Sequence, residues 1–194
     1  MADGDVVEFR SKQRLAGKQP GGSPLRQAPI GNGGDMERAD TASRVIDAPL
    51  RRVYAALVDP HTLVEWLPPQ GMTGHFDHFD ARAGGSYRMT LTYAEAPASG
   101  GKSGVDSDVV EGRFVEIAPD DRVVQAIDFQ SDNPSFAGTM IMTWTVREVD
   151  GGTRVDMRAD HVPPGITAED HVAGMTSSLS NLATYIAGPH SSPD

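Results

Sequence analysis

Apolar side chains that could bind a ligand alternate along two segments near the C-terminus. Met140, Met142, Trp144 and Val146 lie two residues apart, and Met157 lies in the segment that follows. Side chains two apart on a strand point to the same face, so these residues share one surface. Methionine adapts to varied apolar molecules, and an indole N–H adds a polar contact. The pattern predicts either a filled core or a pocket for an apolar molecule.

Other sequence motifs that could bind a ligand or catalyse a reaction match their known patterns less well. Gly100-Gly101-Lys102-Ser103 resembles the end of a phosphate-binding loop, but Ala96 stands where that motif needs its first glycine. We interpret it as a hairpin loop. No nucleophile motif of the Gly-x-Ser-x-Gly type appears, so no catalytic residue is predicted.

The histidines predict no metal site. His75 and His78 are three apart on a predicted strand and should point to opposite faces, with no third ligand placed by the sequence. His171 is expected on a helix surface, although it could lie near a pocket mouth. Asp128 is expected to be one of several outward charges on strands, and it would be a possible base only if it turned inward.

Hydrophobic periodicity predicts the elements that position these residues. A short strand at Ser43–Ala48 precedes two helices. Each helix is predicted to begin with a capping carboxylate followed by proline, in Asp47-Ala48-Pro49 and in Asp59-Pro60. A helix over Ala168–Ile186 closes the chain. Between them, strands are predicted at Met72–Ala81, Ser86–Ala94, Asp108–Ile117, Arg122–Gln130, Gly138–Val149 and Thr153–His161. Tight turns between consecutive strands imply an antiparallel sheet covered by one helix layer.

Composition excludes several classes of protein. The chain has 194 residues, a net charge of -10 and no cysteine. An acidic domain repels nucleic acid and anionic membranes. Without cysteine there is no disulfide and no thiolate site. We therefore expect a cytoplasmic protein without a cofactor, and without nucleic-acid or membrane partners, as a monomer or homodimer.

The chain divides into three parts by composition. Residues 1–40 are rich in glycine, proline and polar side chains, which predicts a disordered extension, native or from expression. Residues 41–188 carry the periodic segments and form the predicted domain. Residues 189–194 are expected to be a flexible tail.

Four motifs in order resemble one known family. Val45-Ile46-Asp47-Ala48-Pro49 through Trp66 resembles the opening of START-like, birch-pollen-allergen-like (SRPBCC) domains, and more narrowly of the family of the activator of heat-shock protein 90 ATPase. Asp80–Tyr87, Gly112–Val124 and Asp170–Ala183 resemble its later signatures. The resemblance implies an α+β helix-grip fold, in which a bent antiparallel sheet of about six to seven strands packs on a long C-terminal helix around a cavity.

In such a fold the alternating apolar face would line the cavity. The predicted ligand-binding residues are Trp66, Tyr87, Met89, Leu91, Phe114, Phe129, Met140, Met142, Trp144, Met157, Met175 and Leu179.

Three functions remain open at this level. The first is a non-enzymatic domain that binds a small apolar molecule between sheet and helix. The second is a co-chaperone or protein-interaction module that stimulates a heat-shock protein 90 ATPase, as the family name implies. The third is a polyketide-cyclase-like enzyme, which would need an acid–base pair in the cavity.

Overall fold

A curved antiparallel sheet frames the part of the chain that the structure, a computed structural model, describes: residues 38–94, 107–129 and 133–188. Within these ranges the elements are β1 (Ala39–Ile46), α1 (Leu50–Val58), α2 (Pro60–Trp66), β2 (Met72–Phe79), β3 (Ser86–Tyr93), β4 (Ser107–Ala118), β5 (Arg122–Phe129), the 3-10 turn η1 (Pro134–Phe136), β6 (Gly138–Val149), β7 (Gly152–Asp160) and α3 (Ala168–Ala187). Residues 1–37 of the predicted extension over residues 1–40, the tail, and the loop with Gly100–Ser103 lie outside the described residues, and Ala39 and Asp40 belong to β1.

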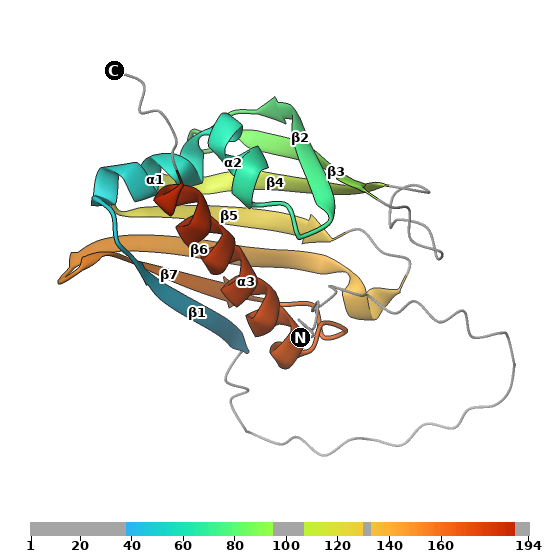
Figure 1. Cartoon of the computed structure of the whole chain (residues 1–194). Helices are drawn as coiled ribbons and strands as arrows, with labels where there is room; N and C mark the ends of the chain where they lie inside the picture. The colour runs from blue at the N-terminus through green and yellow to red at the C-terminus, as the bar shows by residue number, and fades with distance from the viewer. Residues whose placement is uncertain (1–37, 95–106, 130–132, 189–194) are drawn as a thin grey trace, which may run out of the picture.

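The strand order is β1-β7-β6-β5-β4-β3-β2, and every neighbouring pair is antiparallel. The first strand joins the sheet beside the last, so the two strands furthest apart in sequence are neighbours. Figure 1 shows α3 lying across one side of the sheet, with α1 and α2 near its C-terminal end. The predicted helix-grip architecture is confirmed.

Strand β6 shows why this sequence forms a two-faced sheet. Met140, Met142, Trp144 and Val146 are buried, whereas the residues between them are partly exposed. The hairpin from β6 to β7 then turns through two glycines with positive φ. Gly152 (φ 130°) is required by packing as well, because a Cβ there would lie 2.2 Å from the carbonyl oxygen of Ile46.

Helix α1 begins differently from the prediction. Pro49 occupies its N-cap position and no side chain caps it, so the expected capping by Asp47 is wrong. The expected cap of α2 is confirmed, since the Asp59 carboxylate accepts a hydrogen bond from the backbone N–H of His61 at 2.9 Å. Both short helices also depend on packing of their apolar faces against the sheet, and α1 does so without a side-chain cap.

A β-bulge changes the faces of the two histidines on β2. The register with β3 shifts between Phe76 and His78, so His75 pairs with Thr90 and His78 with Arg88. Thr90 and Arg88 are two apart, and the two histidines therefore share the outer face. The expectation of opposite faces is wrong because it assumed an unbroken alternation.

The core lies between the sheet and α3. One stripe of α3 is buried and consists of His171, Met175, Leu179, Leu182 and Ile186. The expected surface position of His171 is therefore wrong, because only 5% of this residue is exposed. No helix in the described ranges is long and apolar enough to cross a membrane.

Candidate functional site

The twelve predicted binding residues do not form one open pocket. Ten of them are buried, and only Leu91 and Phe129 are partly exposed. Nine belong to the main core cluster, Phe129 packs at its margin, and Met89 and Leu91 lie outside it. Most of this face is therefore filled with its own side chains. Their role in binding stays a prediction, and only a small part of the face is open.

The open part is a small cavity between α1, α2 and the sheet. Its volume is about 30 Å³, enough for about one water molecule. Its lining residues are Leu57, Leu63, Trp66, Leu67, Gln125 and Trp144. The indole rings of Trp66 and Trp144 meet edge to face, with centroids 5.8 Å apart. These are the only two tryptophans of the chain.

The polar side-chain atoms that line this cavity differ in whether they have a hydrogen-bond partner in the protein. The indole N–H of Trp66 donates to the carbonyl oxygen of Ala56 at 3.1 Å, so Trp66 presents only its ring. Among the described residues, the Gln125 amide and the Trp144 N–H have no protein partner. The one fully enclosed, unpartnered side-chain atom in the same ranges is the hydroxyl of Tyr54. The polar atoms of Gln125 and Trp144 therefore remain reachable by solvent-sized molecules.

Gln125 is the functional candidate that the sequence reasoning missed. It lies opposite Phe114 on β4 and Met142 on β6, both buried, so it belongs to the inner face. The signal was available, because Gln125 alternates with Val123 and Ile127 on β5. A lone glutamine on an apolar inner face is unusual, and this one is only partly buried, with its amide open to solvent-sized molecules.

The inner face continues from this cavity along β5. Ile127 and Phe129 follow Gln125 at two-residue spacing and are partly exposed while packing against the core. Successive residues of one face lie ~7 Å apart along a strand. Gln125, Ile127 and Phe129 therefore form a stripe, here called the β5 stripe, that leads away from the cavity and leaves part of its surface accessible.

An aromatic cluster supports the sheet beside this stripe. Tyr87, Phe114, Phe76 and Phe79 pack with ring centroids 4.7 to 6.2 Å apart. Tyr87 lies directly over Gly112, where a Cβ would come within 2.4 Å of its ring. Burial raises the pKa of the Tyr87 hydroxyl, so this side chain stays neutral and structural.

A second polar group lies at the other end of α3. Nδ1 of His171 is 2.8 Å from Oδ2 of Asp40, and both side chains are almost fully buried. Arg38 donates to both carboxylate oxygens, at 2.9 and 2.6 Å, and also to the carbonyl oxygen of Ile166. This group, here called the β1–α3 clamp, fastens the first turn of α3 and the preceding loop to β1.

Electrostatics give the clamp a structural character. Burial alone would raise the pKa of the Asp40 carboxyl, but hydrogen bonds from Arg38 and His171 outweigh it and hold that pKa below its ordinary value. Asp40 is thus ionised and already neutralised by Arg38. The enzyme hypothesis needs an acid–base pair that faces substrate. Both oxygens of the Asp40 carboxylate are instead hydrogen-bonded to Arg38 or His171 and join β1 to α3.

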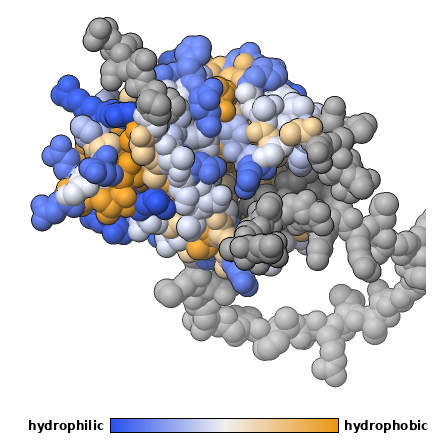
Figure 2. All heavy atoms as spheres, in the orientation of Figure 1, coloured by the Kyte–Doolittle hydropathy of each residue, from blue (hydrophilic) through white to orange (hydrophobic). Residues whose placement is uncertain are grey.

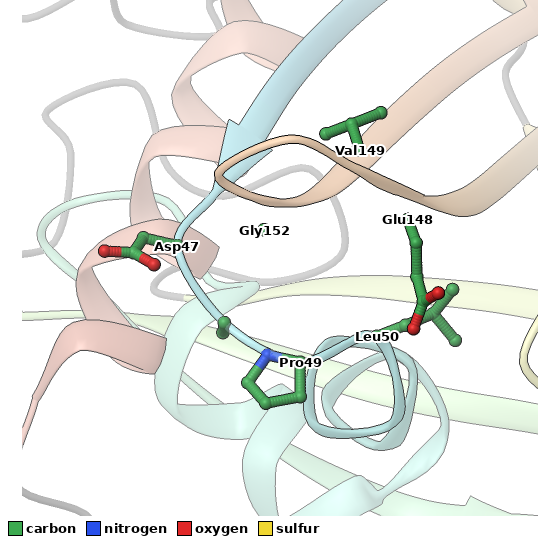
Figure 3. Close-up of a pocket in the computed structure, with 7 residues that line it drawn as sticks. Asp47, Pro49, Leu50, Glu148, Val149 and Gly152 are labelled. Atoms are coloured by element: carbon green, nitrogen blue, oxygen red, sulfur yellow. The ribbon is translucent and has the colours of Figure 1, made fainter.

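A larger surface depression lies elsewhere and suits a ligand poorly. It spans about 470 Å³ where the β6–β7 hairpin meets the link from β1 to α1, and Figure 3 shows Glu148 and Val149 of the hairpin with Asp47, Pro49 and Leu50 of the link around it. Figure 2 shows apolar surface on the same side of the molecule as α1, ringed by hydrophilic residues. The depression is open to solvent, whereas ligand sites enclose most of the ligand.

The outer face of the sheet is occupied by charges that pair across strands. Asp128 is exposed, accepts a hydrogen bond from Thr139 at 2.6 Å and lies 3.7 Å from Arg113. It therefore points outward, as expected, and is no base for the inner face. His75 bonds Asp77 and His78 bonds Ser86, both at 3.0 Å.

Relatives of known structure share this architecture. A protein from Chromobacterium violaceum is 29% identical, with a TM-score of 0.65 over 77% of this chain and 97% of that one. A protein from Rhodobacter sphaeroides is 22% identical, with a TM-score of 0.63 over 80% and 95%. An AHSA1-like protein from Aeromonas hydrophila is 17% identical, with a TM-score of 0.61 over 81% and 100%. No protein with a curated description matches the chain.

A sequence model of one protein family matches most of this chain. The model of the activator of Hsp90 ATPase homolog 1-like protein matches residues 47–187, from the end of β1 to the end of α3. It covers most of the chain and includes both tryptophans, Gln125 and the whole β5 stripe. The chain therefore belongs to the family of activator of Hsp90 ATPase homolog 1-like proteins.

Proposed function

We propose that this chain binds a small apolar molecule without chemical change, on the inner face of the sheet at the Trp66–Trp144 cavity and along the β5 stripe. The observation that carries the proposal is the break in an otherwise filled core. There, two indoles, three leucines and one unpartnered amide surround a space that their own side chains leave empty. Sites with an apolar lining and a few polar groups are typical of small-molecule binding.

The size of the cavity limits how the molecule binds. A space of about 30 Å³ is smaller than the ~150 Å³ of an engineered cavity that accepts benzene. One end of the ligand therefore occupies the cavity, after small movements of Leu63 or Leu67, and the rest lies against Ile127 and Phe129. Leu67 is only partly buried at the C-cap of α2, so it is better placed to change rotamer than the buried Leu63.

Native mass spectrometry tests this proposal on protein purified gently from its own host. We expect a bound apolar molecule on the wild-type protein. Ile127→Asp should abolish the added mass, because it places a charge on the β5 stripe. Val115→Asp is the matched control, since Val115 is an exposed strand residue that is 54% accessible and points away from the inner face. Wild-type protein that carries no added mass, and binds no offered hydrophobe, would refute the proposal.

The family name supports a second candidate, stimulation of a heat-shock protein 90 ATPase. The observation in its favour is the match over residues 47–187. An ATPase assay with the host's heat-shock protein 90 homologue tests it directly. Unchanged ATP turnover at a large excess of this chain would remove this candidate and leave the binding proposal untouched.

A further inference from the structure

We infer that the ligand is a neutral molecule with a ring and one hydrogen-bonding head, and that the Gln125 amide selects this head. The inference rests on the proposed function, because it concerns the same cavity. Gln125 is the one non-aromatic polar residue in the lining. Its amide supplies both a donor and an acceptor.

The unpartnered state of Gln125 indicates a ligand with polar atoms. No hydrogen bond joins its side chain to the described protein. The amide is open to water in the ligand-free protein, since it is not among the enclosed atoms without a partner, but an apolar ligand seated on it would displace that water and leave the amide unpaired, at a loss of free energy. A head group that bonds the amide compensates this loss, whereas a pure hydrocarbon leaves it in place.

The rest of the lining sets the ligand's shape. The indoles of Trp66 and Trp144 lie at 78° to each other, so one presents an edge and the other a face. Rings prefer such offset or edge-to-face contacts. The Trp66 N–H is already bonded to Ala56. Once Leu63 or Leu67 has moved, a ring placed against the indoles meets apolar surface on the Trp66 side, while its head reaches Gln125 and the Trp144 N–H, which has no partner among the described residues.

Charge excludes an anionic head. None of the described residues that line the cavity is a lysine or arginine, and the chain carries a net charge of -10. Moving a carboxylate from water to an apolar site without a cationic partner is strongly unfavourable. A carboxamide, hydroxyl or ketone head fits the site, and a carboxylate does not.

Three probes of one shape test the inference by tryptophan fluorescence. Benzamide carries a carboxamide head, isopropylbenzene replaces it with carbon at equal size, and benzoate replaces it with a charge. Both tryptophans of the chain line the cavity, so the emission reports on this site alone. We expect wild-type protein to bind benzamide about tenfold more tightly than isopropylbenzene, and to leave benzoate unbound.

Gln125→Met should remove that preference, because methionine keeps the length of glutamine without its amide. The ratio of the two dissociation constants should fall about tenfold. Thr143→Val is the matched control, since Thr143 lies opposite Val124 on the outer face and its loss should leave the ratio unchanged.

The outcomes separate the two proposals. If none of the probes changes the emission, the proposed function fails. If benzamide and isopropylbenzene bind wild-type and Gln125→Met protein with the same ratio, the role of Gln125 is refuted and the proposed function stands. If benzoate binds as tightly as benzamide, the neutral head is refuted.

Discussion

The β1–α3 clamp gives the sharpest stability prediction. Asp40→Asn keeps the size of the side chain but removes the charge that accepts three hydrogen bonds, two from Arg38 and one from His171. His171 is buried and cannot turn to water, so we assign its charged hydrogen bond about 2 kcal/mol. The side chain of Arg38 is 34% exposed, and its pair counts as a surface ion pair of about 1 kcal/mol.

The expected loss of unfolding free energy is therefore about 3 kcal/mol, at the lower end of the range for breaking a buried pair. For a domain of this size, 1 kcal/mol corresponds to about 2–4 °C, so the melting temperature should fall by about 10 °C. Thermal and urea unfolding followed by circular dichroism measure it.

Asp160→Asn is the matched control for Asp40→Asn. Asp160 accepts the same bidentate pair from Arg158, at 2.9 and 2.6 Å, on the neighbouring strand but on the exposed face. Its loss should cost less than about 1 kcal/mol. If Asp40→Asn melts within 2 °C of the wild type, or if both variants lose the same stability, the clamp does not hold the helix as described.

The pH dependence of the clamp has a definite sign. The pKa of Asp40 is lower in the folded state than its ordinary value because of Arg38 and His171. Its stabilisation is therefore present above the carboxyl's ordinary pKa of ~4 and is lost as the pH falls through the lower folded value. The difference in unfolding free energy between wild type and Asp40→Asn should stay constant above about pH 4, the ordinary carboxyl pKa, and shrink as the pH falls below it.

Two further substitutions test local packing and capping. Gly112→Ala should lower the free energy of unfolding by about 1–3 kcal/mol, because the new Cβ would lie 2.4 Å from the rigid ring of Tyr87. Gly74→Ala should cost less, because its Cβ meets the movable end of the Met89 side chain. Equal losses for the two variants in urea unfolding would contradict this reasoning. Thr167→Ala should lower the free energy of unfolding by about 1 kcal/mol, because it removes the N-cap of α3. Thr176→Ala is the control, since Thr176 is exposed in the middle of the helix, and it should leave the stability unchanged. A Thr167 variant as stable as wild type would show that the cap does not stabilise the protein.

Local patterns predicted the elements and the antiparallel sheet, and the family resemblance implied the helix-grip fold. The alternation along Gly138–Val149 and the spacing of Met175 and Leu179 depend only on neighbours in sequence, and both elements have the predicted bounds within one residue. The start of β1 was predicted late, because Ala39 and Asp40 are held by contacts with β7 and α3 that no local pattern reveals.

The site was less predictable, for a physical reason. Trp66 and Trp144 are among the predicted binding residues and do line the cavity, but only Trp144 follows from the strand alternation. Whether a core face is filled or open depends on how helices distant in sequence pack, and most of the predicted residues proved to be filled core. The clamp joins residues 131 positions apart, and the shared face of His75 and His78 follows from a bulge. Neither leaves a signal in the spacing of residue types.

Nuclear magnetic resonance of the two indole N–H groups tests the central claim, binding at the Trp66–Trp144 cavity. The chain has two tryptophans, so its spectrum holds two indole signals. The Trp66 signal should exchange slowly, because its N–H donates to Ala56. Added benzamide should shift the Trp144 signal in a saturable way. If neither indole signal moves up to the solubility of benzamide, and signals from the outer face move instead, the cavity is not the binding site.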